Sequence, residues 1–193
     1  MSYIQLEDLK TYLAIATATT SDDALLRSMI SHAGKAIETY CGRKFEAWVA
    51  TRYYDHDALT AGNTLLLDTD LIAVITLTNG NTAATVIPST EYWMVDRNFG
   101  PPYYGIKLKS GSTHSWQWDT DCSVSVAGTW GWSTTPPEDV SQAAIRLSAF
   151  FYRQKDAQVY DTIADEVSGR LFIPKGMPND VKQLLDPYRK RVG

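Results

Sequence analysis

The residues that could carry out chemistry are few and far apart in this sequence. The three histidines are His32, His56 and His114. Only His56 has acidic neighbours on both sides, in the triplet Asp55-His56-Asp57. Adjacent residues of a turn rarely converge on one metal ion. Asp is common in turns because its side chain forms hydrogen bonds with the nearby backbone. We therefore interpret the triplet as a solvated turn and expect no metal site.

Other motifs with chemical meaning are also weak. Asp68-Thr69-Asp70 and Asp119-Thr120-Asp121 have a loose carboxylate spacing, but they lack the Gly and the terminal Glu of a calcium loop, so we predict solvated turns. Gly128-Thr129-Trp130-Gly131 has too few glycines, in the wrong order, to cradle a phosphate. No nucleophile elbow, Walker loop or dinucleotide fingerprint occurs. We therefore predict a protein that is not an enzyme, with no catalytic residue and no cofactor.

The bulk composition sets limits on the class of protein. A length of 193 residues favours one domain with room for an inserted subdomain, and a net charge of −4 argues against a non-specific nucleic-acid binder. Cys41 and Cys122 match neither a disulfide framework nor zinc spacing, and we expect both to be buried. The N-terminus lacks the pattern of a signal peptide, which predicts synthesis in the cytoplasm.

Aromatic residues are the remaining excess. Two tryptophan pairs, Trp116 with Trp118 and Trp130 with Trp132, have the spacing that places both rings of a pair on one face of a strand. Exposed pairs could grip a sugar or a protein, whereas burial in the sheet is the favoured interpretation because large aromatic side chains are usually buried. Tyr103 and Tyr104 follow two prolines in a predicted loop and are better candidates for interface anchors.

Helical patterns lie at both ends of the chain. We predict helices over residues 6–15, from an N-cap at Ser21 to Cys41, from the residues after Pro136-Pro137 to Arg153, and over 178–191, where Pro187 should kink or end the helix. Gly42 supplies the stop of the second helix. Residues 155–177 are less periodic, and a long stretch of that kind is often functional, so it could be an arm.

Residues 43–132 have a strand-like pattern instead. Short runs rich in β-branched and aromatic residues alternate with turn signals such as Asn79-Gly80. The predicted strands are 48–54, 64–67, 72–77, 84–87, 92–95, 105–108 and 122–127. Around residues 124–153 the hydrophobic period changes from 2 to about 3.6, which marks the return to helix. The prediction is an α+β fold, with a frame of about four helices (1–42 and 133–193) and an antiparallel β subdomain inserted between the second and third long helices.

The order of these features resembles a known family. A long helix ends in Tyr40-Cys41-Gly42-Arg43, a β-rich insert follows, and a strand runs through 127–132 into Pro136-Pro137-Glu138-Asp139-Val140. An Ala-rich helix then ends in Phe151-Tyr152-Arg153, and a last segment runs from Pro178 to Arg189. This arrangement resembles the head–tail connector, or adaptor, proteins of tailed bacteriophages and their prophage relatives, over nearly the whole chain.

The resemblance implies a structural virion protein at the head–tail interface, present in the host cytoplasm before assembly. Its copies would form a ring, a dodecamer when assembled and a monomer in isolation, beneath the portal protein. The ring would extend the channel, through which DNA passes without specific binding, and would receive a tail-proximal neck or stopper protein. The candidate interface residues are Phe99, Tyr103, Tyr104, Phe172, Ile173, Tyr188, Arg189, Lys190 and Arg191.

Two alternatives stay open at this point. The first is a carbohydrate- or ligand-binding β module with helical flanks, which would use the four paired tryptophans. The second is a small hydrolase with an unrecognised site.

Overall fold

The computed structural model describes residues 2–60, 63–119, 124–157, 163–164, 171–172 and 176–190, without the side chains of 156–157, 163–164 and 171–172. The chain divides into two compact units: residues 1–42 with 136–193, which we call the helical unit, and residues 43–135, which we call the β unit. Four α-helices and a six-stranded antiparallel sheet in the described part confirm the predicted α+β fold. No helix in this part is long and apolar enough to cross a membrane.

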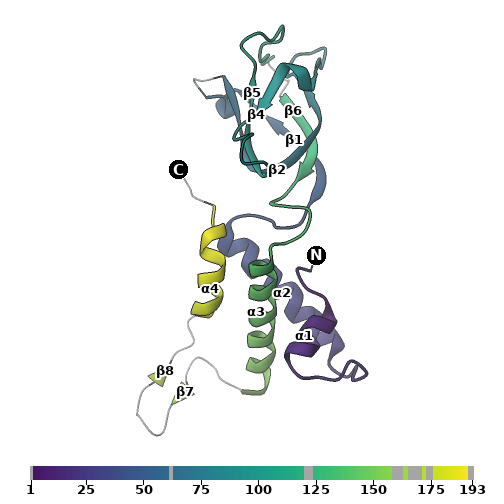
Figure 1. Cartoon of the computed structure of the whole chain (residues 1–193), viewed down its shortest axis with the longest axis vertical. Coiled ribbons are helices and arrows are strands. Elements are labelled where there is room, and N and C mark those ends of the chain that lie inside the picture. Colours follow the sequence, from purple (N-terminus) through teal and green to yellow (C-terminus); the bar gives the residue numbers. More distant parts are fainter. Residues whose placement is uncertain are drawn as a thin grey trace. The chain divides into compact units, whose positions relative to one another are not determined.

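The helical unit is built around α3. Its helices are α1 (Leu6–Tyr12), α2 (Asp23–Cys41), α3 (Glu138–Ala157) and α4 (Asn179–Leu185), and α3 packs against the other three (Figure 1). The buried stripe of α2 contains Leu26, Ile30, Ala33 and Ile37, at the spacing of one helix face. The helical core therefore forms from segments at the two ends of the chain.

The helix boundaries confirm two sequence signals and correct a third. Gly42 ends α2 with a left-handed φ of 67°, and α4 stops at Leu185, before a 3₁₀ turn, η3 (Asp186–Tyr188), that contains Pro187. The predicted N-cap at Ser21 is wrong, because the cap position of α2 is Asp22. The Asp22 carboxylate accepts hydrogen bonds from Lys155 Nζ, at 2.7 Å, and from the Tyr152 hydroxyl, at 2.5 Å, rather than capping the helix.

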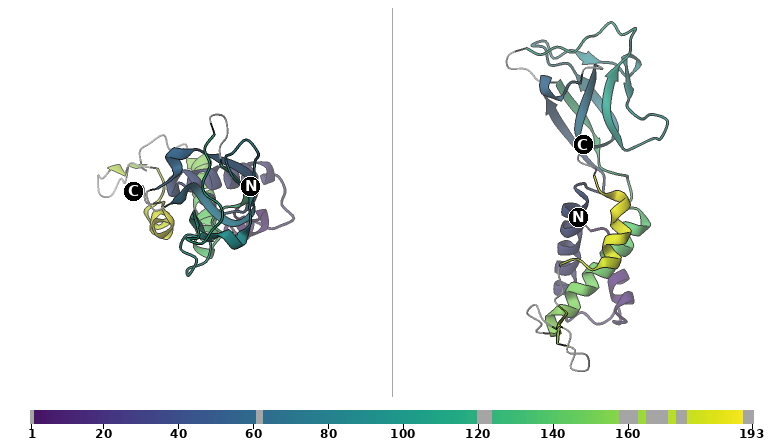
Figure 2. Two further views of the ribbon diagram at one scale, coloured as in Figure 1. Left: turned by 90° about the horizontal axis from the view of Figure 1, so that it is seen from above. Right: turned by 90° about the vertical axis from the view of Figure 1, so that its left-hand side faces the viewer.

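The β unit is one curled antiparallel sheet. Its strands are β1 (Trp48–Tyr54), β2 (Thr64–Thr78), β3 (Val86–Ile87), β4 (Tyr92–Met94), β5 (Tyr103–Leu108) and β6 (Val124–Trp130). Their order is β1-β6-β2-β5-β4, with β3 paired to β2. Figure 2 shows the strands curving around a shared interior, which is filled by side chains such as Leu65, Leu77, Ile106 and Val126.

The second strand corrects the prediction most clearly. Residues 64–67 and 72–77 belong to one strand, β2, and Asp68-Thr69-Asp70 lies within it rather than in a solvated turn. Asp68 accepts hydrogen bonds from Arg52 and from the Tyr54 hydroxyl, and Asp70 pairs with Arg43. Hydrogen-bond and ion-pair partners that are distant in sequence therefore stabilise these carboxylates within a strand. Local turn propensity contains no information about such partners.

The segment that returns the chain to the helices is a buried strand with two special glycines. A Cβ at Gly128 would lie 2.7 Å from the carbonyl oxygen of Ala73, and Gly131 has a φ of 125°. Trp130 is fully buried and its indole Nε1 donates to the Ala50 carbonyl at 2.9 Å. The strand continues to Trp130, three residues beyond the predicted end at residue 127, while the expected burial of Trp130 is confirmed.

Residues 155–177 contain the end of α3 and a small hairpin. Strands β7 (Ile163–Ala164) and β8 (Leu171–Phe172) pair with each other in an antiparallel sheet of their own. The candidate residue Phe172 is a backbone position in β8, and the candidates Ile173 and Arg191 lie outside the described residues.

Candidate functional site

The groups that resembled chemical motifs lie in separate places. The His32 ring packs against Phe151 at a centroid distance of 4.7 Å, and His56 lies edge-on to Trp118 at 5.8 Å. His114 lies 3.9 Å from the Glu91 carboxylate. Within the part of the chain that the structure describes, no group of three or more His, Cys, Asp or Glu side chains could hold a metal ion. The fold therefore does not bring these candidate groups together in one place.

Three of the four paired tryptophans pack in or against the core of the β unit, and Trp132 lies beside Phe45 and the Arg43 guanidinium. Trp116 is only 8% exposed and Trp130 is fully buried, and Trp118 packs against the same core cluster. The Trp116 indole donates to the Asn63 carbonyl at 3.2 Å. Because these rings face inwards, they do not form the open platform that sugar binding by a β module requires.

The loop before β5 presents aromatic residues to solvent. Phe99 lies in the turn after β4 and is 89% exposed, and Tyr104 is exposed as well. Tyr103 and Tyr104 are the first residues of β5, where Tyr103 pairs with Leu71, so the predicted loop position of both tyrosines is wrong. Pairing with β2 fixes their backbone and leaves Tyr104 facing outwards.

Beside these residues lies a hollow that sequence reasoning missed. It has a volume of about 330 Å³, and its lining includes Trp93, Arg97, Tyr103 and Lys109. Arg97 Cζ lies 4.3 Å and Lys109 Nζ 4.1 Å from the centroid of the Trp93 ring. A Lys or Arg within about 6 Å of an indole is attracted by the π system. The sequence alone does not reveal this hollow, because strand pairing brings Trp93 of β4 next to Lys107 of β5.

The candidate residues near the C-terminus are largely tied to the helical unit. The Tyr188 hydroxyl donates to Asp139 at 3.0 Å, and burial followed by that carboxylate raises the Tyr188 pKa. Arg189 Cζ lies 5.1 Å from the ring of Tyr40, and the Lys190 amide donates to the Cys41 carbonyl at 2.8 Å. These contacts hold the chain end against α2 and α3.

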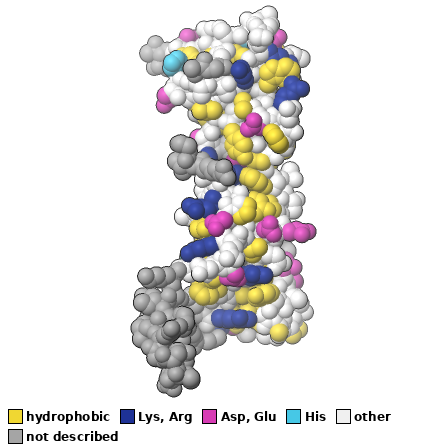
Figure 3. All heavy atoms as spheres, turned by 60° about the vertical axis from the view of Figure 1, so that its left-hand side comes forward, with side chains coloured by type: hydrophobic (Ala, Val, Ile, Leu, Met, Phe, Trp, Pro, Cys, Tyr) yellow, Lys and Arg dark blue, Asp and Glu magenta, His cyan; other side chains and the backbone are white. Residues whose placement is uncertain are grey.

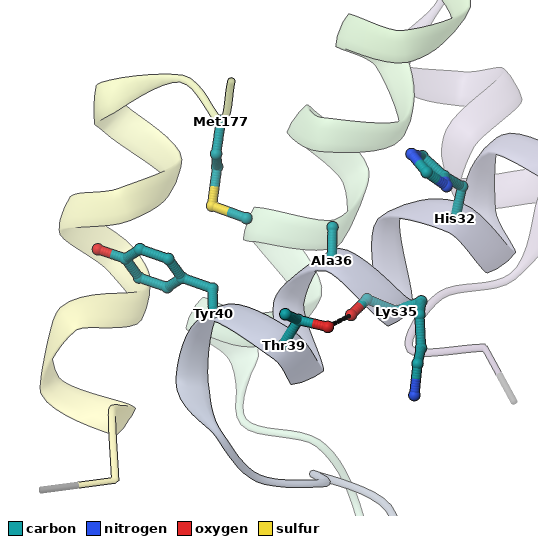
Figure 4. A pocket seen from close by; sticks show the side chains of 6 residues that line it. All are labelled: His32, Lys35, Ala36, Thr39, Tyr40 and Met177. Carbon is teal, nitrogen blue, oxygen red and sulfur yellow. Dashed lines mark hydrogen bonds between the residues drawn. The ribbon is translucent and has the colours of Figure 1, made fainter. Parts of the chain in front are cut away.

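An apolar groove lies along the outer side of α2. His32, Ala36 and Tyr40, one helical turn apart in succession, line it together with Met177, and its volume is about 410 Å³ (Figure 4). The Thr39 hydroxyl is turned to the Lys35 carbonyl, to which it donates at 3.0 Å. The groove suits an apolar side chain of a partner better than a polar ligand.

The charges on the helical unit are mixed. On the face shown in Figure 3, basic and acidic side chains alternate over the described part of the helices, without a continuous basic stripe. Such a stripe is the usual footprint of a protein that grips nucleic acid. The distribution is therefore consistent with the net charge of −4.

Comparison with known proteins decides the family. A model of the head completion protein family matches residues 2–191. The chain belongs to the head completion protein family. A search among curated proteins gave no match. The match over nearly the whole length confirms the resemblance to phage head–tail connector proteins that the order of sequence features indicates.

The fold of this head completion protein is shared with solved particle structures. A chain in the neck of an empty gene transfer agent particle, computed with C6 symmetry, is 18% identical, with a TM-score of 0.67 and coverage of 98% of this chain and 91% of that one. A chain in the virion of the native gene transfer agent is 19% identical, with a TM-score of 0.63 and coverage of 98% and 91%. A chain in the native neck, computed with C12 symmetry, is also 19% identical at a TM-score of 0.63, with coverage of 97% and 89%.

Proposed function

We propose that this protein is a structural component of the neck of a phage or phage-like particle. Twelve copies form a closed ring beneath the portal protein, extend the DNA channel and provide the platform for a tail-proximal neck or stopper protein. The observation that carries the proposal is the family match over residues 2–191. The fold shared with neck chains in particles of C6 and C12 symmetry supports it.

The architecture suits this role. A closed ring requires a heterologous contact, in which each copy uses two different surfaces. The β unit offers the exposed Phe99 with the neighbouring hollow around Trp93, and the helical unit offers the groove along α2, which are surfaces of the kind that such contacts use. The candidate interface residues remain part of the proposal, with Phe99 and Tyr104 as its best exposed members.

The chain is proposed to let DNA pass without holding it. A net negative charge disfavours contacts with phosphates, whereas a basic wall would bind them in a salt-dependent way. Duplex DNA should therefore show no binding in fluorescence anisotropy at low salt. Tight binding that weakens steeply as salt is added would contradict this part of the proposal.

The decisive experiment is assembly in vitro. DNA-filled heads that carry the portal but lack this protein are mixed with the purified chain, and the vertex is imaged by cryo-electron microscopy. We expect a new ring of density under the portal and heads that accept tails. Unchanged vertices would reject the proposal, whereas a monomer in solution would not, because the portal can template the ring.

The choice of variant for this assay follows from the fold. Truncation after Pro178 would test the C-terminus directly, but it removes α4, whose Val181 and Leu185 are fully buried in the helical core. Substitution of exposed side chains avoids this loss. Phe99→Ser should leave the circular dichroism spectrum unchanged and lower ring occupancy, with Thr51→Ser as an exposed control on the same unit.

A further inference from the structure

Three basic side chains gather around one tryptophan at one edge of the sheet. Trp93 on β4 is 43% exposed, with Arg97 and Lys109 near its ring and Lys107 directly opposite on β5. Among the described residues, none of the three cations forms an ion pair with a carboxylate. We call these four residues the basic cluster. Lys109 Nζ also donates to the Thr90 carbonyl. The group is therefore a positively charged surface that an anionic group of a partner would complement.

The chemistry of the basic cluster favours carboxylates over nucleic acid. A guanidinium over an indole keeps its N–H edges free, and those edges bind a carboxylate through two parallel hydrogen bonds. The Trp93 ring already has two cations beside it, so a stacked base would have to displace one. The adjoining hollow of about 330 Å³, also lined by Ser89 and Tyr92, has the size of a few side chains of a peptide turn.

An acidic turn of complementary charge follows β1, at the 3₁₀ turn η1 (His56–Ala58), which contacts β2. Asp55 and Asp57 follow β1 and flank His56, and both carboxylates are exposed. Neither forms an ion pair with a described cation. β1 and β4 are the two terminal strands in the order β1-β6-β2-β5-β4. Among the described residues, no ion pair joins the acidic turn to the basic cluster, so the two do not neutralise each other within the chain.

We propose that the Asp55–Asp57 turn of one copy docks on the basic cluster of the next copy in the ring. The inference rests on the proposed function, because a ring places neighbouring copies so that two different surfaces of the chain meet. Each copy then uses two different surfaces, which is the condition for a heterologous contact that closes. Opposite charges placed in this way fix which surfaces meet and reject the like-charged alternatives. Exposed Tyr53, at the end of β1, adds apolar contact beside the acidic turn.

Charge reversal tests the contact. Variant A carries Arg97→Glu and Lys109→Glu, variant B carries Asp55→Lys and Asp57→Lys, and variant AB carries all four. With heads that lack the protein, A and B alone should each lower ring occupancy at the vertex by about tenfold or more. Variant AB should restore occupancy, because every junction again joins unlike charges. An equimolar mixture of A and B should restore it as well, in rings where the two alternate.

The controls separate this contact from folding, from DNA and from the ring itself. Arg27→Glu with Arg153→Glu makes the same charge change as A on exposed positions of α2 and α3 that do not line the groove along α2, and should assemble normally. Normal rings from A and B, or no rescue by AB and by the mixture, would overturn the inference. A different result would also overturn the inference: wild type binds duplex DNA, and variant A loses this binding but still forms rings. The basic cluster would then be a DNA-binding surface. Failure of wild type to form a ring would instead reject the proposed function.

Covalent capture gives a second readout that needs no variant. A carbodiimide joins a carboxylate to an amine only when the two are in contact, so it should link Asp55 or Asp57 to Lys107 or Lys109 in assembled rings. Rings grown from a mixture of ¹⁴N- and ¹⁵N-labelled protein identify links between copies by mass. Links found only within one copy, or only to the portal, would contradict the inference.

Discussion

The ammonium group of Lys10 lies 2.5 Å from Asp23 Oδ1, and the lysine is only 2% exposed. The same Nζ donates to the carbonyl oxygens of Thr17, at 3.2 Å, and Thr19, at 2.8 Å. A single buried cation therefore binds the start of α2 and the loop between α1 and α2. The loop residues have poor helix propensity. Hydrogen bonds from this lysine, rather than a hydrophobic stripe, hold the loop in place.

Replacing Lys10 by Met should destabilise the helical unit. The substitution keeps the apolar stem but leaves a partly buried carboxylate and two carbonyls without their cation. We expect the free energy of unfolding to fall by about 2–4 kcal/mol in urea denaturation followed by circular dichroism. Lys35→Met, which removes an exposed pair with Glu38, is the control and should change it by about 0.5 kcal/mol or less. Equal effects of the two substitutions would show that the Lys10 network is not stabilising.

The two aspartates of β2 should differ in their importance for stability. Asp70 pairs with Arg43 at 3.4 Å, the two side chains being 2% and 7% exposed, and the guanidinium also lies 4.5 Å from the Trp132 ring. Asp70→Ala would leave the buried Arg43 cation without this carboxylate and should lower the free energy of unfolding by about 3–5 kcal/mol. Asp68→Ala removes a half-exposed partner of Arg52 and should lower the free energy of unfolding by about 1 kcal/mol. Comparison of their urea midpoints checks this order, and a larger effect of Asp68→Ala would refute it.

Glycine at position 131 should be essential for the last turn of the β unit. An added Cβ would lie 2.5 Å from the Glu46 carbonyl oxygen, and the φ of 125° is strained for any other residue. Gly131→Ala should therefore lower the free energy of unfolding by about 2 kcal/mol or more. Gly111→Ala, where a Cβ meets nothing within 4 Å, is the control and should be close to neutral. Thermal melting of both variants measures the difference.

Acid should weaken the contact between β1 and β2. Burial pushes the Asp68 pKa upwards, but hydrogen bonds from Arg52 and Tyr54 outweigh it and hold the pKa below its ordinary value. The unfolded chain therefore takes up this proton at a higher pH than the folded chain. The stabilisation is complete above the unfolded pKa of about 4 and is lost as the pH falls through the folded pKa. The difference in melting temperature between wild type and Asp68→Asn should accordingly shrink below about pH 4. A constant difference down to pH 2 would argue against the bond.

The sequence predicts helices better than surfaces in this protein. The helices were predictable from local signals: the apolar stripes of α2 and α3 and the helix ends near Gly42 and Pro187. These predictions are correct because the apolar residues that give each helix its stripe also fill the core. The strand through Asp68 and Asp70 could not be predicted from local sequence. The cations that pair with the two carboxylates are Arg52 and Arg43, which lie elsewhere in the chain. The basic cluster was missed for a related reason: Trp93 and Lys107 become neighbours only through strand register.

The two ends of the β unit are joined to each other. The amide of Trp132 donates to the carbonyl of Lys44 at 2.9 Å, and Gly131 donates to Asp70. A segment whose entry and exit are fastened in this way can be removed or exchanged as a cassette. Recombination between related genomes could thus replace residues 43–135 while the helices and their core stay unchanged.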